Sequence, residues 1–272
     1  MFKAYILYFF ITLSLLSGSE LQNKIENIIT TKNYQIHKHL IEHLFKNESE
    51  FIVNKNFKYY KIFKLLREHG LLDLKLNHPS DITLEFETIA KNKKAFKILN
   101  DTIKSIGYRY FFTKSFKIDE NKNILWSIKF KAEYITDPVV LIKDLEYKNC
   151  KIINVENRGD NNWFYKIDFE NSILKEAYKI QSNEKVKFQK PLQEYFILVD
   201  DVSSLQVISR NLNNWYPYIV FFDSSMEYID SIKKNRVYKG LKVKIPNNTK
   251  YIKISDSFNL INIKRGLTVI VR

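Results

Sequence analysis

The clearest indication of the fold is YRYFFTKSFKIDENKNILWSIKFKAEYI, residues 108–135. Residues 108–118 and 124–135 are two runs rich in aromatic and aliphatic side chains, and the polar residues 119–123 lie between them. Two such runs on either side of a short polar connection predict a β-hairpin. The segments before and after the hairpin indicate which kind of domain contains it.

A predicted helix lies on each side of this hairpin. Before it, residues 92–107 carry apolar residues at helical spacing and end at Gly107, a natural C-terminal cap. After it, residues 137–149 begin with Asp137 as the N-cap and Pro138 at the first helical position. Both helices therefore have defined starts or ends in the sequence.

Strands are predicted outside the two helices, so the order of elements is β-α-β-β-α-β, with room for one added strand. That order is typical of the split βαβ, ferredoxin-like arrangement, in which one face of a sheet packs on two helices. We assign residues 77–170 to such a domain. The letters NHPSD, residues 77–81, predict a turn before its first strand. The outer strands are expected at residues 82–89, 151–159 and 163–169.

The remaining parts of the chain have different patterns. Residues 20–76 carry apolar residues at helical spacing and predict a helical N-terminal segment. Residues 185–272 contain about seven short strand-like runs separated by turns, which predict an antiparallel β-sandwich. Residues 171–184 are the expected linker. The expected fold class is therefore α+β, with these three parts in tandem.

The composition supports packed cores and argues against nucleic-acid binding. The length of 272 residues suits about two domains. Hydrophobic residues make up 45% of the chain, which is enough for packed cores. The net charge of +14 suggests an anionic partner. However, only 7 of the 44 basic residues are Arg, the residue that favours bidentate phosphate and base recognition. We expect neither a nucleic-acid partner nor a cofactor. The single cysteine, Cys150, is expected to be buried and inert.

The first nineteen residues resemble a secretory signal peptide. Met1, Phe2 and Lys3 precede the apolar run of residues 4–16, and the small residues SGS follow at 17–19. This pattern predicts export, with cleavage after Ser19. The run is too short for an ordinary membrane-spanning helix, and no later segment is long and apolar enough. We expect a periplasmic or secreted protein; an uncleaved N-terminal anchor is the alternative.

The letters HLIEH, residues 39–43, match the H-x-x-E-H pattern and resemble the motif helix of the inverted zinc proteases. In that family the two histidines bind zinc and the glutamate activates water. The resemblance would make His39 and His43 metal ligands and Glu42 the base, with a further glutamate downstream. Glu120 is the candidate for that ligand, although it lies in the predicted hairpin turn.

A helical projection of the same segment favours a packing role. At about 100° per residue, Ile36, Leu40, Leu44 and, more loosely, Ile41 form the expected buried stripe. His39 points with the polar residues, and His43 lies at the edge of that face. His37, which is not part of the motif, is expected to face the core.

A second candidate site is RNLNNWYPYIVFFD, residues 210–223. Aromatic and amide side chains gather there where a loop enters a strand, and such groups can contact a protein or a sugar ring. The nearby run KIPNNTKYIKIS, residues 244–255, resembles a strand-turn-strand piece of jelly-roll carbohydrate-binding modules. The alternative is that Trp215 and Tyr218 anchor the core. The candidate binding residues are Asn213, Asn214, Trp215, Tyr216 and Tyr218.

Taken together, these patterns predict a non-enzymatic binding or adaptor protein of the cell envelope. Its expected partner is another envelope protein or a cell-wall or surface glycan. The alternative is a zinc-dependent hydrolase that uses His39, Glu42 and His43.

Overall fold

The structure is a computed structural model that describes residues 19–89, 93–120 and 123–272. It confirms a mixed α+β fold, in which strands dominate the C-terminal part of the chain. The chain forms two compact units: among the described residues, unit 1 contains 19–89 and 98–172, and unit 2 contains 93–97 and 173–272. Residues 93–97 are the first part of a helix that continues into unit 1. The predicted signal peptide lies outside the described residues, except for Ser19.

Residues 19–68 are mainly helical. Ser19 caps the first helix, since its Oγ accepts a hydrogen bond from the Gln22 backbone N–H (3.2 Å) while its own N–H donates to the Gln22 side chain. None of the helices within the described ranges is long and apolar enough to cross a membrane. The elements are α2 (Glu20–Ile29), α3 (Thr31–Ile36), α4 (Lys38–Leu44), η1 (Glu48–Glu50), β1 (Ile52–Val53), β2 (Asn56–Phe57) and α5 (Tyr59–Glu68).

The predicted buried stripe of this segment was wrong for Ile36 and Leu40, whereas Leu44 is half-buried and Ile41 is buried as predicted. Ile36 is 64% exposed and Leu40 is also exposed, whereas Tyr34 and Ile41 are buried. The reason is a break at His37, whose backbone leaves helical geometry (φ −108°, ψ 17°) and separates α3 from α4. A continuous helix would have kept the expected face, but the break changes which side chains of α4 point inward.

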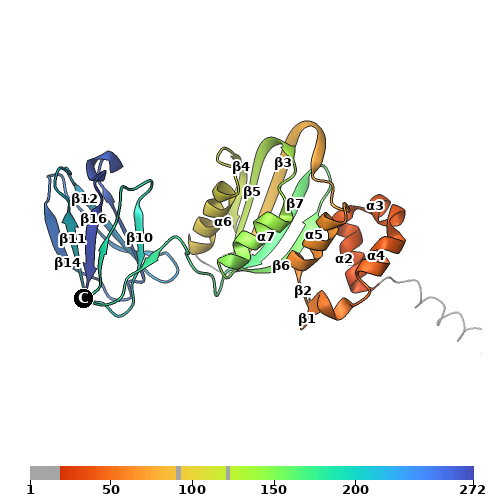
Figure 1. Ribbon diagram of the computed structural model, residues 1–272, viewed down its shortest axis with the longest axis horizontal. Coiled ribbons are helices and arrows are strands. Elements are labelled where there is room, and N and C mark those ends of the chain that lie inside the picture. Colours follow the sequence, from red (N-terminus) through yellow and green to blue (C-terminus); the bar gives the residue numbers. More distant parts are fainter. Residues whose placement is uncertain (1–18, 90–92, 121–122) are drawn as a thin grey trace, which may run out of the picture. The chain divides into compact units, whose positions relative to one another are not determined.

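Unit 1 contains one five-stranded sheet in the order β4-β5-β3-β7-β6. Its central strand β3 runs antiparallel to β5 and parallel to β7. Helices α6 and α7 lie on the same face of the sheet (Figure 1). The elements are β3 (Lys75–Thr88), α6 (Lys93–Ser105), β4 (Phe112–Ile118), β5 (Ile124–Tyr134), α7 (Pro138–Tyr147), β6 (Lys151–Asn157) and β7 (Asn162–Asp168).

The predicted hairpin is confirmed as β4 and β5, which pair antiparallel. Asp119 closes the connection, because its carboxylate accepts hydrogen bonds from the Asn123 backbone N–H (2.7 Å) and side-chain amide (3.0 Å). Asp137 caps α7 as predicted, through a hydrogen bond from the Val139 N–H (2.9 Å). The predicted turn at residues 77–81 was wrong: β3 continues through it, and a register irregularity against β5 accommodates Pro79.

Unit 2 contains two sheets, in the orders β13-β12-β15-β10-β8 and β14-β11-β16-β9. Side chains from both sheets, such as Ile219 and Ile252 from one and Val207 and Val269 from the other, belong to one buried hydrophobic cluster. The elements are β8 (Tyr178–Lys179), β9 (Lys185–Lys187), β10 (Tyr195–Leu198), β11 (Ser204–Ser209), β12 (Pro217–Phe222), β13 (Tyr228–Lys233), β14 (Gly240–Lys244), β15 (Tyr251–Asp256), η2 (Leu260–Ile263) and β16 (Leu267–Val271).

Candidate functional site

The H-x-x-E-H residues lie on the surface of α4. The His39 side chain is fully exposed, and its Nδ1 lies 3.9 Å from a carboxylate oxygen of Glu42. His43 is also exposed, as is Glu120 in the hairpin connection. Within residues 19–89, 93–120 and 123–272, no three His, Cys, Asp or Glu side chains form a group that could hold a metal ion. Metal binding by His39 and His43 therefore stays a prediction. Both side chains are exposed to solvent.

The aromatic turn of unit 2 divides into buried and surface residues. Trp215 is fully buried, and its Nε1–H donates to the Ser255 backbone carbonyl (2.9 Å). Asn213 is also buried; its amide donates to the Gly266 carbonyl (2.9 Å) and its Oδ1 accepts from the Arg265 N–H (3.0 Å). These two candidate binding residues therefore hold the loop in place from inside the unit.

A buried carboxylate, Asp256, ties this turn to the loop that follows β15. Its Oδ2 accepts a hydrogen bond from the Tyr216 backbone N–H (2.8 Å). Its Oδ1 accepts from the Phe258 N–H (2.9 Å), the Asn259 N–H (3.0 Å) and the Asn262 side-chain amide (2.9 Å). Hydrogen bonds to a charged acceptor are stronger than neutral ones, so four of them fix both loops firmly. The sequence analysis missed Asp256, although the Asp-Ser-Phe-Asn run, residues 256–259, is typical of an Asx turn.

The two loops together present an apolar surface. The Tyr216 and Phe258 rings meet edge to face, with centroids 4.9 Å apart. Phe258 and Ile261 are each 67% exposed. Asn214 is exposed as well, and its backbone N–H donates to the Asn262 carbonyl (2.9 Å). We call Asn214, Tyr216, Phe258 and Ile261 the loop surface. Of the candidate residues in the sequence, it keeps Asn214 and Tyr216.

The last candidate, Tyr218, lies outside this surface. It is half-buried on β12, and the ammonium of Lys253 lies 5.2 Å from its ring centroid. Such a contact between a cation and an aromatic face is weakly attractive at an exposed site. Tyr218 is therefore accessible, but it belongs to the sheet rather than to the loops.

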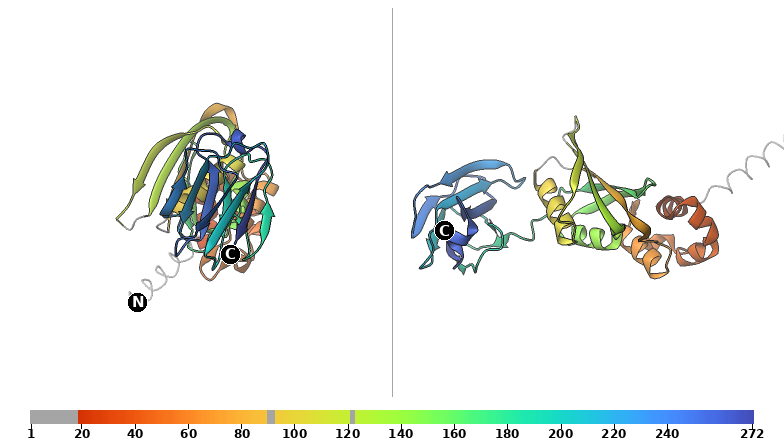
Figure 2. Two further views of the ribbon diagram at one scale, coloured as in Figure 1. Left: turned by 90° about the vertical axis from the view of Figure 1, so that its left-hand side faces the viewer. Right: turned by 90° about the horizontal axis from the view of Figure 1, so that it is seen from above.

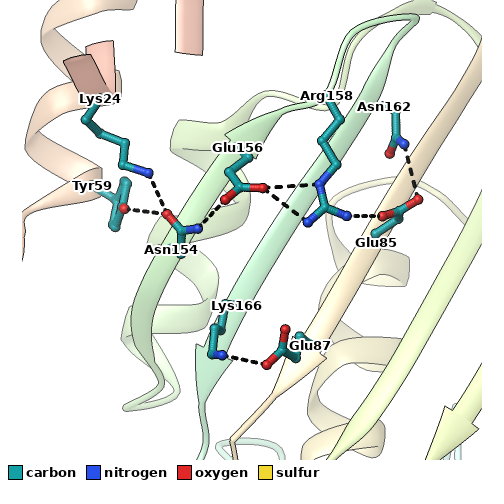
Figure 3. Close-up of polar contacts among 9 residues, drawn as sticks. All are labelled: Lys24, Tyr59, Glu85, Glu87, Asn154, Glu156, Arg158, Asn162 and Lys166. Atoms are coloured by element: carbon teal, nitrogen blue, oxygen red, sulfur yellow. Dashed lines mark hydrogen bonds and ion pairs between the residues drawn. The ribbon is translucent and has the colours of Figure 1, made fainter. Parts of the chain in front are cut away.

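Unit 1 has its own polar cluster, on the face of the sheet opposite the buried side chains of β3. Asn154 of β6 accepts hydrogen bonds from the Lys24 ammonium (2.7 Å) and the Tyr59 hydroxyl (3.0 Å), and it donates to Glu156 (2.7 Å) (Figure 3). Burial lowers the pKa of Lys24 and raises that of Tyr59. This asparagine joins α2 and α5 to the edge strand of the sheet.

Arg158 continues the cluster across the sheet. Its guanidinium reaches Glu85 (2.6 Å) and Glu156 (3.1 Å), and it stacks 3.8 Å from the Phe164 ring centroid. Lys166 pairs with Glu87 at 2.6 Å in the same view (Figure 3). Each of these carboxylates has a cation beside it, so the cluster neutralises its own charge. The arrangement is that of a structural clamp between strands.

No protein-family model matches this sequence, and no curated protein matches it. We therefore infer the function from the surfaces of the two units.

We predict that Asp256→Ala lowers the free energy of unfolding of unit 2 by about 3 kcal/mol, because it leaves buried N–H donors without an acceptor. Urea unfolding followed by the fluorescence of Trp215, with Trp126 and Trp163 replaced by Phe, measures this loss. Asp200→Ala is the control, since Asp200 is exposed and loses only a surface ion pair with Lys250 (2.7 Å), which should shift the midpoint little. An equal midpoint for both variants would contradict the role given to Asp256.

We also predict that His43→Ala changes neither the metal content nor the stability of the chain, because His43 lies at the surface. The measurement is elemental analysis of protein purified without a histidine tag, together with thermal unfolding. Stoichiometric zinc in the natural chain that is lost in His43→Ala would support the hydrolase alternative instead.

Proposed function

We propose that the protein is an exported, non-enzymatic binding or adaptor protein that contacts an envelope protein through the loop surface of unit 2. The observation that supports this proposal is that large apolar side chains are exposed next to backbone segments that the buried Asp256 carboxylate fixes by hydrogen bonds. Phe258 and Ile261 would bury substantial apolar area on contact. Since the loops are already fixed, little ordering entropy would be lost on binding.

A protein partner fits this surface better than a glycan does. Phe258 and Ile261 have no polar group in their side chains, and each is 67% exposed. Sugars are recognised by polar groups that converge around an aromatic platform, and Asn214 is the one amide of the four residues that define the surface. Interface cores, in contrast, are enriched in aromatic side chains and depleted in charged ones.

The finer architecture is part of the same proposal. The order β3-α6-β4-β5-α7-β6-β7, with β5 inserted between β3 and β4, supports a ferredoxin-like domain with one added strand, at residues 77–170. The shared hydrophobic cluster of the two sheets in unit 2 supports a mainly antiparallel β-sandwich at residues 185–272. The predicted linker, residues 171–184, contributes to this unit as well, because its strand β8 pairs parallel with β10. In both kinds of domain, function depends on the loops and on the edges of the sheets rather than on the fold itself.

The basic charge suits an envelope location in this proposal. A net charge of +14 would attract the protein to anionic polymers of a cell surface, and the charge would act at long range rather than at one site. The zinc-hydrolase alternative has no comparable support, since its two histidines lie on an open helix surface.

Export predicts a mature chain that begins at Glu20. Cleavage after Ser19 would remove the N-cap of α2, which typically contributes about 1 kcal/mol, so the first turn of α2 should fray in the mature protein. The intact mass of protein recovered from the cell envelope measures the cleavage point. A chain that retains Met1 would contradict cleaved export and would support the uncleaved anchor.

For binding, we predict that the double variant Phe258→Ser/Ile261→Ser weakens capture of the envelope partner by at least about tenfold, because both apolar anchors are lost. The measurement is cross-linking and capture from envelope extract with the full chain, followed by mass spectrometry. The matched control is Tyr228→Ser, which removes an exposed aromatic side chain of β13 in the same unit.

Two results would contradict this proposal. An unchanged set of partners in a folded double variant would remove the loop surface from the proposed function. Retention of the chain by purified cell-wall glycan, lost in the double variant, would replace the protein partner with a sugar.

A further inference from the structure

We propose that the outer edge of β4 in unit 1 binds an extended, acidic segment of a partner protein as an additional strand. This surface is separate from the loop surface of unit 2, and the inference does not depend on it. The argument rests on the position of β4 in the sheet, on its exposed side chains and on its charge.

The two edges of the sheet in unit 1 differ. β6 is contacted by α2 and by the short strand β2, whereas β4 pairs with β5 on one side and with no other described strand. The β4–β5 hairpin stands out from the body of unit 1 (Figure 2). The backbone N–H and C=O groups on the outer side of such a strand are a template for another strand.

All seven side chains of β4 are exposed, and several are large and apolar. Tyr110, just before the strand, is 92% exposed, Phe112 is 81% exposed and Ile118 is 62% exposed. Phe112 lies opposite Lys129 and Ile118 lies opposite Ile124 on β5, so the two side chains lie on opposite faces of the sheet. An added strand would therefore meet apolar contacts on both of its faces, which is how strand addition gains specificity beyond the backbone.

The charge of this edge indicates the chemistry of the partner. Arg109, Lys114 and Lys117 lie along it, and residues 108–118 contain no acidic side chain. Across the described ranges, none of these three cations makes an ion pair with another residue of the chain. Asp119, at the end of β4, is already bound by Asn123 in the hairpin connection. A strand with acidic residues would pair with these cations, since opposite charges across neighbouring strands are stabilising.

The same features disfavour a second copy of the chain as the occupant. Two β4 edges brought together would place Lys114 and Lys117 of both copies side by side, with no carboxylate within β4 itself to compensate. In addition, the register of β4 against β5 is irregular at Lys114, between the pairs Thr113–Ile128 and Ser115–Ser127. A bulge and a lysine on an edge strand are known protections against indiscriminate pairing. The edge is therefore selective, and it favours a different, acidic chain.

The test uses the full chain and two synthetic peptides. In the first peptide, the Glu peptide, every second residue is Val and the positions between are occupied by Glu or Thr. In the second peptide each Glu is replaced by Lys. We expect the Glu peptide to bind at least tenfold more tightly by fluorescence anisotropy. We also expect it to slow amide hydrogen exchange at residues 112–118. The double variant Lys114→Glu/Lys117→Glu should reverse the preference between the peptides.

The matched control is Lys242→Glu/Lys244→Glu on β14, an edge strand of unit 2 that also carries two lysines. This variant should bind the Glu peptide as the natural chain does. Equal binding of both peptides, or of neither, would overturn the proposal. So would a self-associating chain in sedimentation velocity whose contact protects residues 112–118, because the occupant would then be a second copy.

Discussion

Unit 1 depends on the double pairing of β3. Because β3 lies between β5 and β7, its alternating side chains must satisfy two environments at once. Ile82, Leu84 and Phe86 are buried in the core. Glu85 and Glu87 point to the other face, and there they pair with Arg158 and Lys166. The period of two in a strand thus fixes both the core and the charged cluster of this unit.

The charged cluster also explains how the N-terminal helices are held without a disulfide. Cys150 is the only cysteine, so a disulfide within the chain is excluded. Asn154 takes over part of that task, since it accepts from Lys24 of α2 and from Tyr59 of α5. Leaving the buried Tyr59 hydroxyl and the half-buried Lys24 ammonium without an acceptor would cost more than the hydrogen bonds contribute. Polar groups at this edge therefore fix geometry, while the apolar side chains beneath provide most of the stabilisation.

The two proposed binding surfaces, the loop surface and the β4 edge, would recognise a partner in different ways. On the loops, a buried carboxylate and a buried asparagine fix the backbone around Tyr216 and Phe258, so specificity would come from shape. At β4, the backbone would provide the contact, and Lys114 and Lys117 would select the charge of the incoming strand. One proposed surface lies in each unit, which suits the proposed adaptor function. Neither requires a metal ion or a catalytic group.

The elements that follow from local chemistry could be predicted from the sequence. The hairpin of residues 108–135, the cap at Asp137 and the strand-rich C-terminal part all depend on neighbouring residues, and all are present in the structure. The aromatic turn was also recognised as a candidate, and Asn214 and Tyr216 remain at its surface.

Burial, however, depends on contacts between residues far apart in the chain. The sequence left Trp215 open as a binding residue or an anchor of the core, and it made Asn213 a binding candidate. The structure buries both, and their side chains donate to the backbone carbonyls of Ser255 and Gly266, about forty and fifty positions later. The break at His37 exposes Ile36 and Leu40, which a continuous helix was expected to bury. Strand β3 runs through the sequence with turn chemistry, although its pairing with β5 is interrupted between Lys75 and Ser80. Periodicity and capping thus determine which elements form. Which side chains they bury and which they expose is set by long-range packing, because a residue's exposure is a property of its neighbours in space.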